Sequence, residues 1–477
     1  MTWLDAVAPA RMKRVALVAP EGALRDVLVR VADAGAVDFG QSDGTGAAPG
    51  DTPGPGEAAR RLRRAGQPVP DAALSASRPD LSALEQAGRY DLLAGEAQLE
   101  AYAAVAVRRS GAAALAGWIP ASRLTLLAAA LAEAGGAVVS LPMPRWIQPP
   151  TLLAGRPLKR SLDPLVQTYG TVPYADIDPS WLAWLSYVLM FGMMFGDVGE
   201  GVALLTAACL LRSGWPGWAR RFRQAWPFVG GAGLAATIFG VLYGECFGPT
   251  GIVPVVWLDP LSRPLTLLAA AIGVGVALLA GAYILGAINR WREGGWPSVL
   301  YAPSGIAGIA VFLGVGTAAG GWYVHRGPML AAGGVLATAG LVLATVGFLA
   351  DAGGGAAGTV QASVELFDLV VRLGSNVVSF TRLAAFGLTH AALGLLVWEA
   401  TRALWRHGGG FTVVAVAVFA AGTALAFSLE ALVAAIQALR LEYYELFSRL
   451  FVTQGRPFAP WQVSVVRNEA VVKGEIT

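Results

Sequence analysis

The sequence is poor in charged residues, histidine and cysteine. Of its 477 residues, 14% are Asp, Glu, Lys or Arg, three are histidine and two are cysteine. Cys209 and Cys246 cannot build a disulfide framework or a CxxC metal site, so we expect them to pack as small apolar side chains. The net charge of +3 gives no reason to expect a nucleic-acid partner.

Motifs for hydrolytic chemistry are also missing. The chain has no GxxxxGK[ST] phosphate loop, no HExxH zinc motif and no plausible Ser/His/Asp set. We therefore predict that it has no catalytic residues, binds no cofactor or metal, and does not split ATP itself. An apolar core typical of a signal peptide is absent from MTWLDAVAPARMKRV, which predicts a cytoplasmic start of the chain.

Hydrophobic residues, in contrast, are abundant. They make up 55% of the chain, and the mean hydropathy is +0.56. A soluble protein does not reach such values, so the fold class predicted is a polytopic α-helical protein of a cell membrane. Residues 1–147 differ, because two strand–helix–strand patterns there, the first at 15–19, 24–34 and 37–39, predict a cytoplasmic α/β domain.

The rest of the chain divides by composition. We predict a proline-punctuated linker at 148–178, a first bundle of membrane helices at 179–350, long membrane helices carrying the ion path at 359–447, and a cytoplasmic tail at 448–477. About eight spans result if the first apolar block folds into a hairpin that turns at Gly196-Asp197. The positive-inside rule favours that hairpin, since it keeps Arg220, Arg221 and Arg223 cytoplasmic, and it places both ends of the chain in the cytoplasm.

Two apolar stretches near the end carry isolated polar residues. Residues 376–398, about 34 Å long as a helix, contain Arg382 and His390; residues 411–441 contain Glu430, Gln437 and Arg440. A guanidinium within the membrane costs several kcal/mol unless water or a partner receives it. Each stretch thus presents an arginine and a titratable group displaced along the membrane normal, as an ion path with a fixed central charge requires. The alternative is that Arg382 extends to an interface from a helix end.

These residues carry a resemblance to a known family. SFTRLAAFGLTHA and LRLEYYELFSRLFVTQGRPFAPW resemble the last two membrane helices of the stator subunit of V/A-type rotary ATPases, called I in bacteria and archaea and a in eukaryotes. FGMMFGDVGEG at 191–201 and FGVLYGECFG at 239–248 agree, and the resemblance covers most of residues 145–477. The GWIP turn also resembles the family's N-terminal lobes, although the long helical hairpin that joins them there is severely shortened here.

The resemblance implies a non-catalytic subunit that forms ion half-channels beside a rotating ring of proteolipid (c/K) subunits. It would couple H⁺ or Na⁺ translocation to ATP hydrolysis or synthesis in the complex. The implied partners are that ring, the peripheral stalk, the central stalk with its ATP-hydrolysing head, and the lipid membrane. Two other functions stay open: a stand-alone ion channel or secondary transporter, and a structural membrane anchor whose arginines only pair with acidic neighbours.

Arg382 is the strongest candidate, because a ring carboxylate that passes a permanent cation is favoured in its ionised form and must first release its ion. Arg440 would reinforce this charge, and Gln437 would hydrogen-bond an arginine or the ring carboxylate. The alternatives are that Arg440 is an interfacial arginine neutralised by Glu442 or Glu445, and that Gln437 is an amide satisfied between helices.

Three of the remaining candidates match positions of the family. Glu430 lies ten residues before Arg440, and His390 eight after Arg382; Asp368, fourteen before Arg382, matches an acidic position of the cytoplasmic half-channel. Further candidates are Glu365 beside that half-channel, Glu245 at the outer aqueous entry, and Asp197 with Glu200 at the hairpin tip, where the family commonly has histidine in place of Glu200. The alternatives are a buried, hydrogen-bonded imidazole at His390 and a merely solvated carboxylate at Asp368.

Overall fold

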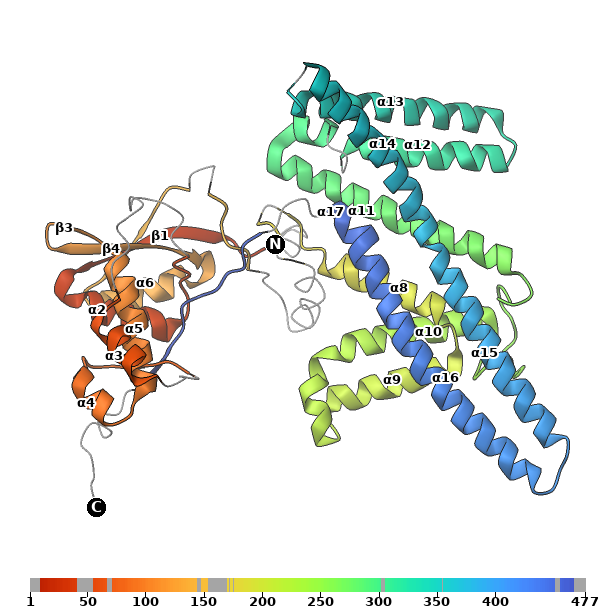
Figure 1. The fold of residues 1–477 in the computed structure, drawn as a ribbon, viewed down its shortest axis with the longest axis horizontal. Coiled ribbons are helices and arrows are strands. Elements are labelled where there is room, and N and C mark those ends of the chain that lie inside the picture. The colour runs from red at the N-terminus through yellow and green to blue at the C-terminus, as the bar shows by residue number, and fades with distance from the viewer. Residues whose placement is uncertain are drawn as a thin grey trace. The chain divides into compact units, whose positions relative to one another are not determined.

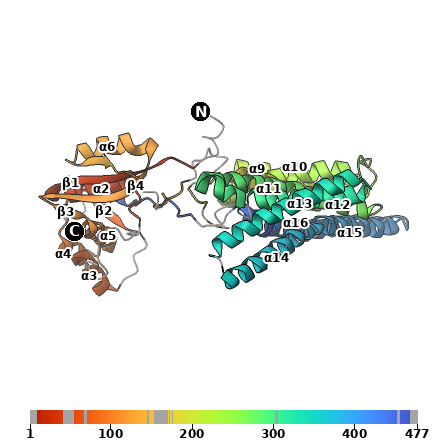
Figure 2. The same cartoon turned by 90° about the horizontal axis from the view of Figure 1, so that it is seen from above.

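The computed structural model describes residues 9–40, 55–66, 71–143, 147–152, 170, 172–174, 176–301, 305–353, 355–450 and 455–466. The chain divides into two compact units (Figures 1 and 2). One comprises Gly155–Gln454 with Met1–Ala8 and is here called the helical unit; the other comprises Pro9–Ala154 with Gly455–Thr477 and is called the α/β unit. Most of the linker expected at 148–178 lies outside the described residues.

A four-stranded antiparallel sheet organises the α/β unit. Its order is β3 (Val107–Arg109), β4 (Ala112–Pro120), β1 (Met12–Pro20), β5 (Ala137–Ser140). Strand β1 alternates, with Val15, Leu17 and Ala19 buried, so one face of the sheet joins a core with helices α2 (Leu24–Ala34) and α6 (Leu124–Ala132). The mixed α/β fold is confirmed. Because β1 and β4 pair along their nine residues, the two strand–helix–strand segments share one sheet.

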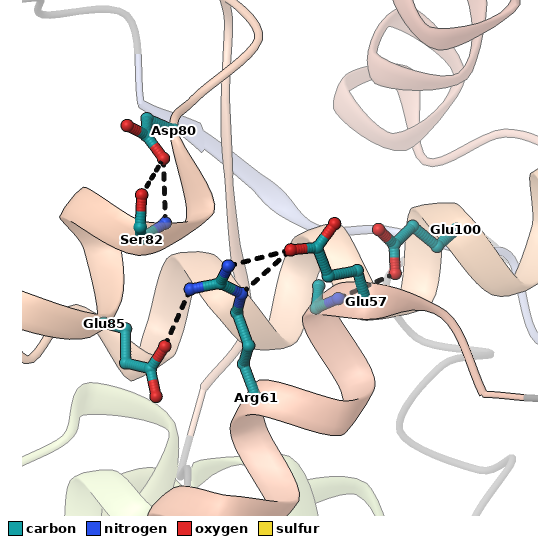
Figure 3. A network of polar contacts seen from close by, with 7 residues as sticks. Glu57, Arg61, Asp80, Ser82, Glu85 and Glu100 are labelled. Atoms are coloured by element: carbon teal, nitrogen blue, oxygen red, sulfur yellow. Dashed lines mark hydrogen bonds and ion pairs between the residues drawn. The ribbon is translucent and has the colours of Figure 1, made fainter.

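Three short helices complete this part of the unit: α3 (Glu57–Ala65), α4 (Leu81–Gln86) and α5 (Tyr90–Val105). Figure 3 shows the polar contacts between them. Arg61 on α3 donates to Glu57 Oε1 one turn earlier, at 2.8 and 3.1 Å, and to Glu85 Oε2 on α4, at 2.9 Å. Asp80 caps α4 by accepting from the backbone N–H of Ser82 at 2.9 Å. The arginine-rich face is thus solvated and ion-paired.

The end of the described chain folds into the same unit. Strand β6 (Ser464–Val466) pairs in parallel with β2 (Ala73–Ser75). The Trp461 ring packs 4.7 Å from that of Tyr102, and its backbone N–H donates to the carbonyl of Val37 at 2.9 Å. Arg456 Nη2 lies 2.8 Å from Asp38 Oδ1. The α/β unit is therefore built from chain that precedes the helical unit and chain that follows it.

The helical unit contains a succession of apolar helices. They are α8 (Ser180–Met194), α9 (Val198–Ser213), α10 (Trp226–Tyr243), α11 (Pro264–Tyr301), α12 (Ile306–Tyr323), α13 (Gly327–Asp351), α14 (Gly355–Ser379), α15 (Thr381–Trp405) and α16 (Phe411–Leu441), followed by a π-helical segment η4 (Glu442–Phe447) and α17 (Ser448–Leu450). Figure 1 shows α14 leading into α15. Helix α11 contains a break at Gly295.

Six helical stretches in the described chain are long and apolar enough to cross a membrane. They are Gly217–Tyr243, Pro264–Arg292, Val299–Tyr323, Gly327–Asp351, Gly355–Trp405 and Phe411–Leu450. The predicted long apolar helices are confirmed. The expected count of about eight spans is not, because α8 and α9 have only 15 and 16 residues, shorter than a typical crossing.

Glycines bring the helices into close contact. A Cβ atom at Gly314 on α12 would lie 2.3 Å from the backbone nitrogen of Ala337 on α13, and both figures show these helices side by side. A Cβ at Gly240 on α10 would similarly lie 2.3 Å from the backbone nitrogen of Val198 at the start of α9. Small residues permit such approach between helices in lipid. The second contact fixes the tip of the α8–α9 hairpin against α10.

Candidate functional site

The two candidate arginines line one pocket, here called the arginine pocket. Arg382 is the second residue of α15, and Arg440 is the penultimate residue of α16. These helices run antiparallel and side by side (Figure 1), so the start of one meets the end of the other. The other lining residues are Ser375, Ser379, Ile436, Leu439, Tyr443, Tyr444 and Glu445. The structure thus places Arg382 and Arg440, 58 positions apart in the chain, around a common space.

Both guanidinium groups lack an ionic partner in the described part of the chain. Arg382 is half-buried and Arg440 is exposed, and neither takes part in a hydrogen bond or ion pair there. The acidic neighbours expected as alternative partners of Arg440 are engaged elsewhere. Glu442 accepts a hydrogen bond from Ser186 Oγ on α8, and Glu445 Oε2 accepts one from the Asn376 amide at 2.7 Å when that amide is turned to satisfy its donors. Two positive charges therefore face the pocket without neutralisation.

Gln437 lies one turn before Arg440 on α16. Its Oε1 atom is buried and has no hydrogen-bond donor among the described residues. Leaving a buried acceptor unsatisfied costs about 1–3 kcal/mol. Gln437 is therefore not an amide that is fully satisfied between helices, because its oxygen can still accept a hydrogen bond from a further group.

A second site lies two to three turns along the same helices. His390 Nδ1 of α15 is hydrogen-bonded to Glu430 Oε2 of α16. The imidazole is 7% exposed and packs against the Phe195 ring, with centroids 4.9 Å apart. His390 lies about 12 Å along α15 from Arg382, and Glu430 about 15 Å along α16 from Arg440. Antiparallel packing brings His390 and Glu430 into contact at one level of the helix pair. It places Arg382 and Arg440 around the pocket at the other level.

Asp197 joins this site to the α8–α9 hairpin. It is fully buried and caps α9, since its Oδ1 accepts from the backbone N–H of Glu200 at 3.0 Å. The same oxygen accepts from Phe247 N–H at 2.9 Å, and Oδ2 accepts from Gly248 N–H at 2.9 Å. These three backbone donors satisfy the carboxylate and tie the hairpin tip to the loop that follows α10.

Two more carboxylates converge on His390. One ligand atom each from Asp197, Glu245 and His390 lie within 4.8 Å of one another, and the same holds for Glu200, His390 and Glu430. We call these five residues the outer cluster. Glu200 and Glu245 are buried, 4% and 5% exposed, and Glu200 Oε2 has no hydrogen-bond partner among the residues that the structure describes. Spacing along the chain predicts each of these acids separately, and only the packing of α8–α10 on α15 and α16 brings them together.

The candidates on α14 lie apart from both sites. Asp368 Oδ2 pairs with Arg372 Nε at 2.6 Å, one turn later on the same helix, and the two side chains are 48% and 66% exposed. Glu365 accepts from Gln361 Nε2 at 3.0 Å. Neither acid lines the arginine pocket. In this chain alone, both are partly solvated carboxylates on an amphipathic helix.

One polar contact beside the arginine pocket is not visible to sequence reasoning. Glu442 is 1% exposed, and its partner Ser186 lies 256 residues away in the sequence. The sequence offers only the acidic run EYYE directly after Arg440, from which Glu442 was expected to be a neutralising partner. The π-helical segment that begins at Glu442 turns this carboxylate toward α8 instead.

Comparison with known proteins finds similarity to one family. Residues 103–220 match the model of the V-type ATPase 116kDa subunit family. The A-type ATP synthase subunit I of Aeropyrum pernix is 24% identical over 68% of this chain and 52% of its own length, and that of Archaeoglobus fulgidus is 27% identical over 73% and 58%. The V-type proton ATPase 116 kDa subunit a 3 of Homo sapiens is 30% identical over 26% of this chain and 16% of its own length.

The chain spans about half the length of the archaeal relatives that it matches. The family model covers strands β3, β4 and β5 of the α/β unit and the α8–α9 hairpin, and so includes Asp197 and Glu200. On these matches, the chain is similar to the V-type ATPase 116kDa subunit family and to relatives named subunit I or subunit a.

Proposed function

We propose that this chain is the membrane-embedded stator subunit of a V/A-type rotary ATPase or ATP synthase. It forms ion half-channels and couples H⁺ or Na⁺ translocation to ATP hydrolysis or synthesis carried out by partner subunits. The observation that supports this most directly is the arginine pocket, in which two guanidinium groups lack a counter-ion within the described chain. Two cations on apolar helices are suited to an anionic group supplied by another subunit.

The mechanism follows from the charge of that pocket. A carboxylate on a rotating ring helix that comes opposite Arg382 and Arg440 is stabilised in its ionised form, so it must give up its ion before it passes. The same fixed charge repels cations that would otherwise leak straight through. Gln437 supplies a free acceptor next to the arginines, for a protonated ring carboxyl group or a guanidinium.

Ions reach and leave the ring through two separate paths in this proposal. The outer cluster around His390 and Glu430 lines the outer half-channel, two to three turns from the arginine pocket. On the other side, Asp368 and Glu365 on α14 form the cytoplasmic half-channel, where their partial exposure gives contact with water. The arginine pocket separates the two paths, so that ions cross only by riding on the ring.

The pairing of β2 with β6 supports a topology with both ends of the chain in the cytoplasm. Chain that precedes the helical unit and chain that follows it form one sheet, so both lie on the same side of the membrane. The helices between them then cross an even number of times. Six crossings satisfy this condition, and so do eight if the α8–α9 hairpin also spans. The cytoplasmic side follows from the arginine-rich loops.

We further propose the partners that such a subunit requires: the ring of proteolipid (c/K) subunits, the peripheral stalk, the central stalk with its ATP-hydrolysing head, and lipid. The short helices α3 to α5 take the place of the long hairpin in this assembly. A purely structural anchor fits less well, because that function calls for arginines paired with acidic neighbours. Arg382 and Arg440 have no such pair within the described chain.

The test is ion pumping by the assembled complex in proteoliposomes. We expect Arg382→Ala to abolish coupled pumping without loss of membrane insertion or assembly. Arg382→Lys should fail as well, because a buried lysine can lose its proton and lacks the planar five-donor fork. Arg402→Ala is the matched control, since Arg402 lies on the same helix but is 52% exposed, and it should pump normally. Pumping by Arg382→Ala near the wild-type rate would remove the central claim.

A further inference from the structure

The outer cluster combines more carboxylates than its hydrogen bonds account for. Four acidic side chains and one imidazole meet at His390, which belongs to both groups of three convergent ligand atoms. Asp197 is satisfied by its backbone donors. Glu200, however, is 4% exposed, and within the described part of the chain neither its Oε2 nor the buried Oε1 of Glu430 has a hydrogen-bond partner. A buried carboxylate oxygen without a donor needs a proton or a cation.

We propose that Glu200, His390 and Glu430 form a binding site for a divalent transition-metal ion of the Zn²⁺ class, with Asp197 and Glu245 as neighbouring carboxylates. A site that mixes an imidazole nitrogen with carboxylate oxygens suits Zn²⁺, Co²⁺ or Mn²⁺. Ca²⁺ and Mg²⁺ take oxygen ligands and gain nothing from the imidazole. Three protein ligands leave one position for water or a fourth carboxylate.

The geometry requires only a small contraction. The three ligand atoms lie within 4.8 Å of one another. Tetrahedral coordination at metal–ligand distances of about 2.0–2.1 Å places ligand atoms about 3.4 Å apart. Rotation of the Glu200 and Glu430 side chains, each of which has a free oxygen, supplies this movement. The backbone can stay fixed, because the hydrogen bonds that Asp197 accepts hold the α8–α9 hairpin in place and the Phe195 ring packs on the imidazole.

The site is independent of the proposed function, since binding needs no ion flux. Its ligands come from three segments of the chain, which explains why no metal motif is visible in the sequence. Where the outer half-channel proposed above runs through the same residues, a bound divalent ion also blocks that path. Metal binding and block of ion flux can therefore be measured separately.

The experiment is a Co²⁺ titration of the full chain in lipid nanodiscs, followed by visible absorption, with Zn²⁺ as competitor. We expect one Co²⁺ per chain, displaced by Zn²⁺. Glu200→Gln and Glu430→Gln should each weaken binding at least about tenfold, because each removes an anionic ligand while the side chain keeps its shape. Glu399→Gln, an exposed acid on α15, is the control and should bind as the wild type does.

Wild-type affinity and spectrum in both Glu200→Gln and Glu430→Gln would overturn the site, as would an absence of Co²⁺ binding by the wild-type chain. If one of the acid variants fails to fold, His390→Gln provides a second test of the site. This variant should lose the absorption bands that depend on nitrogen ligation. Zn²⁺ should also stop ion flux in the assembled complex. Binding without such block would leave the metal site standing and count against the proposed outer half-channel.

Discussion

The two arginines of the arginine pocket differ from the ion-paired arginines of the α/β unit. In the α/β unit, Arg61 is paired with Glu57 and Glu85 (Figure 3), Arg89 with Asp91, and Arg456 with Asp38. In the helical unit, Arg382 and Arg440 have no such partner among the described residues, although an unpaired charge costs far more between apolar helices than in water. The difference indicates that pairing stabilises the α/β unit, whereas Arg382 and Arg440 remain available to a group from outside the chain.

The outer cluster gives the sharpest way to extend this comparison beyond Arg382. We expect Glu430→Gln to slow ion flux by about tenfold or more, a typical loss when a positioned proton-transfer group is removed. Its stability should change little, because the amide keeps the shape and most hydrogen bonds. The measurement is flux in proteoliposomes at several values of external pH, and the profile should change on the outer side. An unchanged flux and an unchanged profile would make Glu430 a structural residue.

In the α/β unit, the large effects should be on stability. Trp461 is 7% exposed and packs with Phe39 and Tyr102. We expect Trp461→Ala to lower the free energy of unfolding of this unit by about 3–5 kcal/mol, the usual cost of removing a large buried aromatic side chain. Pulse proteolysis of the full chain would measure it, with the exposed Ser464→Ala on β6 as control. Equal resistance of both variants to proteolysis would show that residues 455–466 do not stabilise the α/β unit.

Charge distribution also predicts which loops face outward. Single cysteines near Asp259 and Arg326 should react with a membrane-impermeant thiol reagent added outside, and those near Arg221 and Arg290 should not. The experiment needs a background in which Cys209 and Cys246 are replaced. Outside labelling near Arg221 would show that residues 180–213 cross the membrane an odd number of times. The predicted orientation of every helix that follows would then be reversed.

The smallest effect concerns a paired arginine at the surface. Arg89 donates to Asp91 from Nε and Nη2, at 2.9 and 2.8 Å, and these bonds lower the pKa of the Asp91 carboxyl. The folded-state pKa is therefore below the unfolded value of about 3.9. The stabilisation is present above that pH and is lost as the pH falls through the lowered pKa.

We expect Arg89→Ala to cost less than about 1 kcal/mol, as exposed pairs do. Acid unfolding curves of the full chain should show the difference at neutral pH and its disappearance in strong acid. Ion flux should not change. A flux defect in this variant would break the distinction between paired and unpaired arginines.

Periodicity along the chain predicts individual elements well. Residues 24–34 form a helix with the expected bounds, and the strand expected at 15–19 is the centre of β1. The apolar stretches that contain Arg382 and Arg440 form α15 and α16. Local pattern suffices here because each stretch must bury its own apolar face. The span count is harder, since the short α8 and α9 lie near the limit of a crossing.

Contacts between distant segments could not be predicted in this way. Nothing in the sequence indicates that β6 pairs with β2, or that Ser186 binds Glu442. The convergence of Glu200 on His390 likewise depends on the close approach of α9 and α10 at Gly240. These contacts arise from packing in three dimensions, for which a single sequence gives residue types but no distances. Each candidate acid could thus be named, but the cluster could not.

The pairing of β6 with β2 has a mechanical consequence. Residues 155–454 of the helical unit are in effect an insertion into the α/β unit, because the chain on both sides of them belongs to that unit. A unit held by one flexible connection can swivel about it, whereas two connections resist twisting. In a stator, a sideways force on α15 and α16 from a turning ring would be shared between both connections. Strand β6, which follows these helices, pairs with β2, so under the proposed function residues 455–466 would both carry this force and complete the fold of the α/β unit.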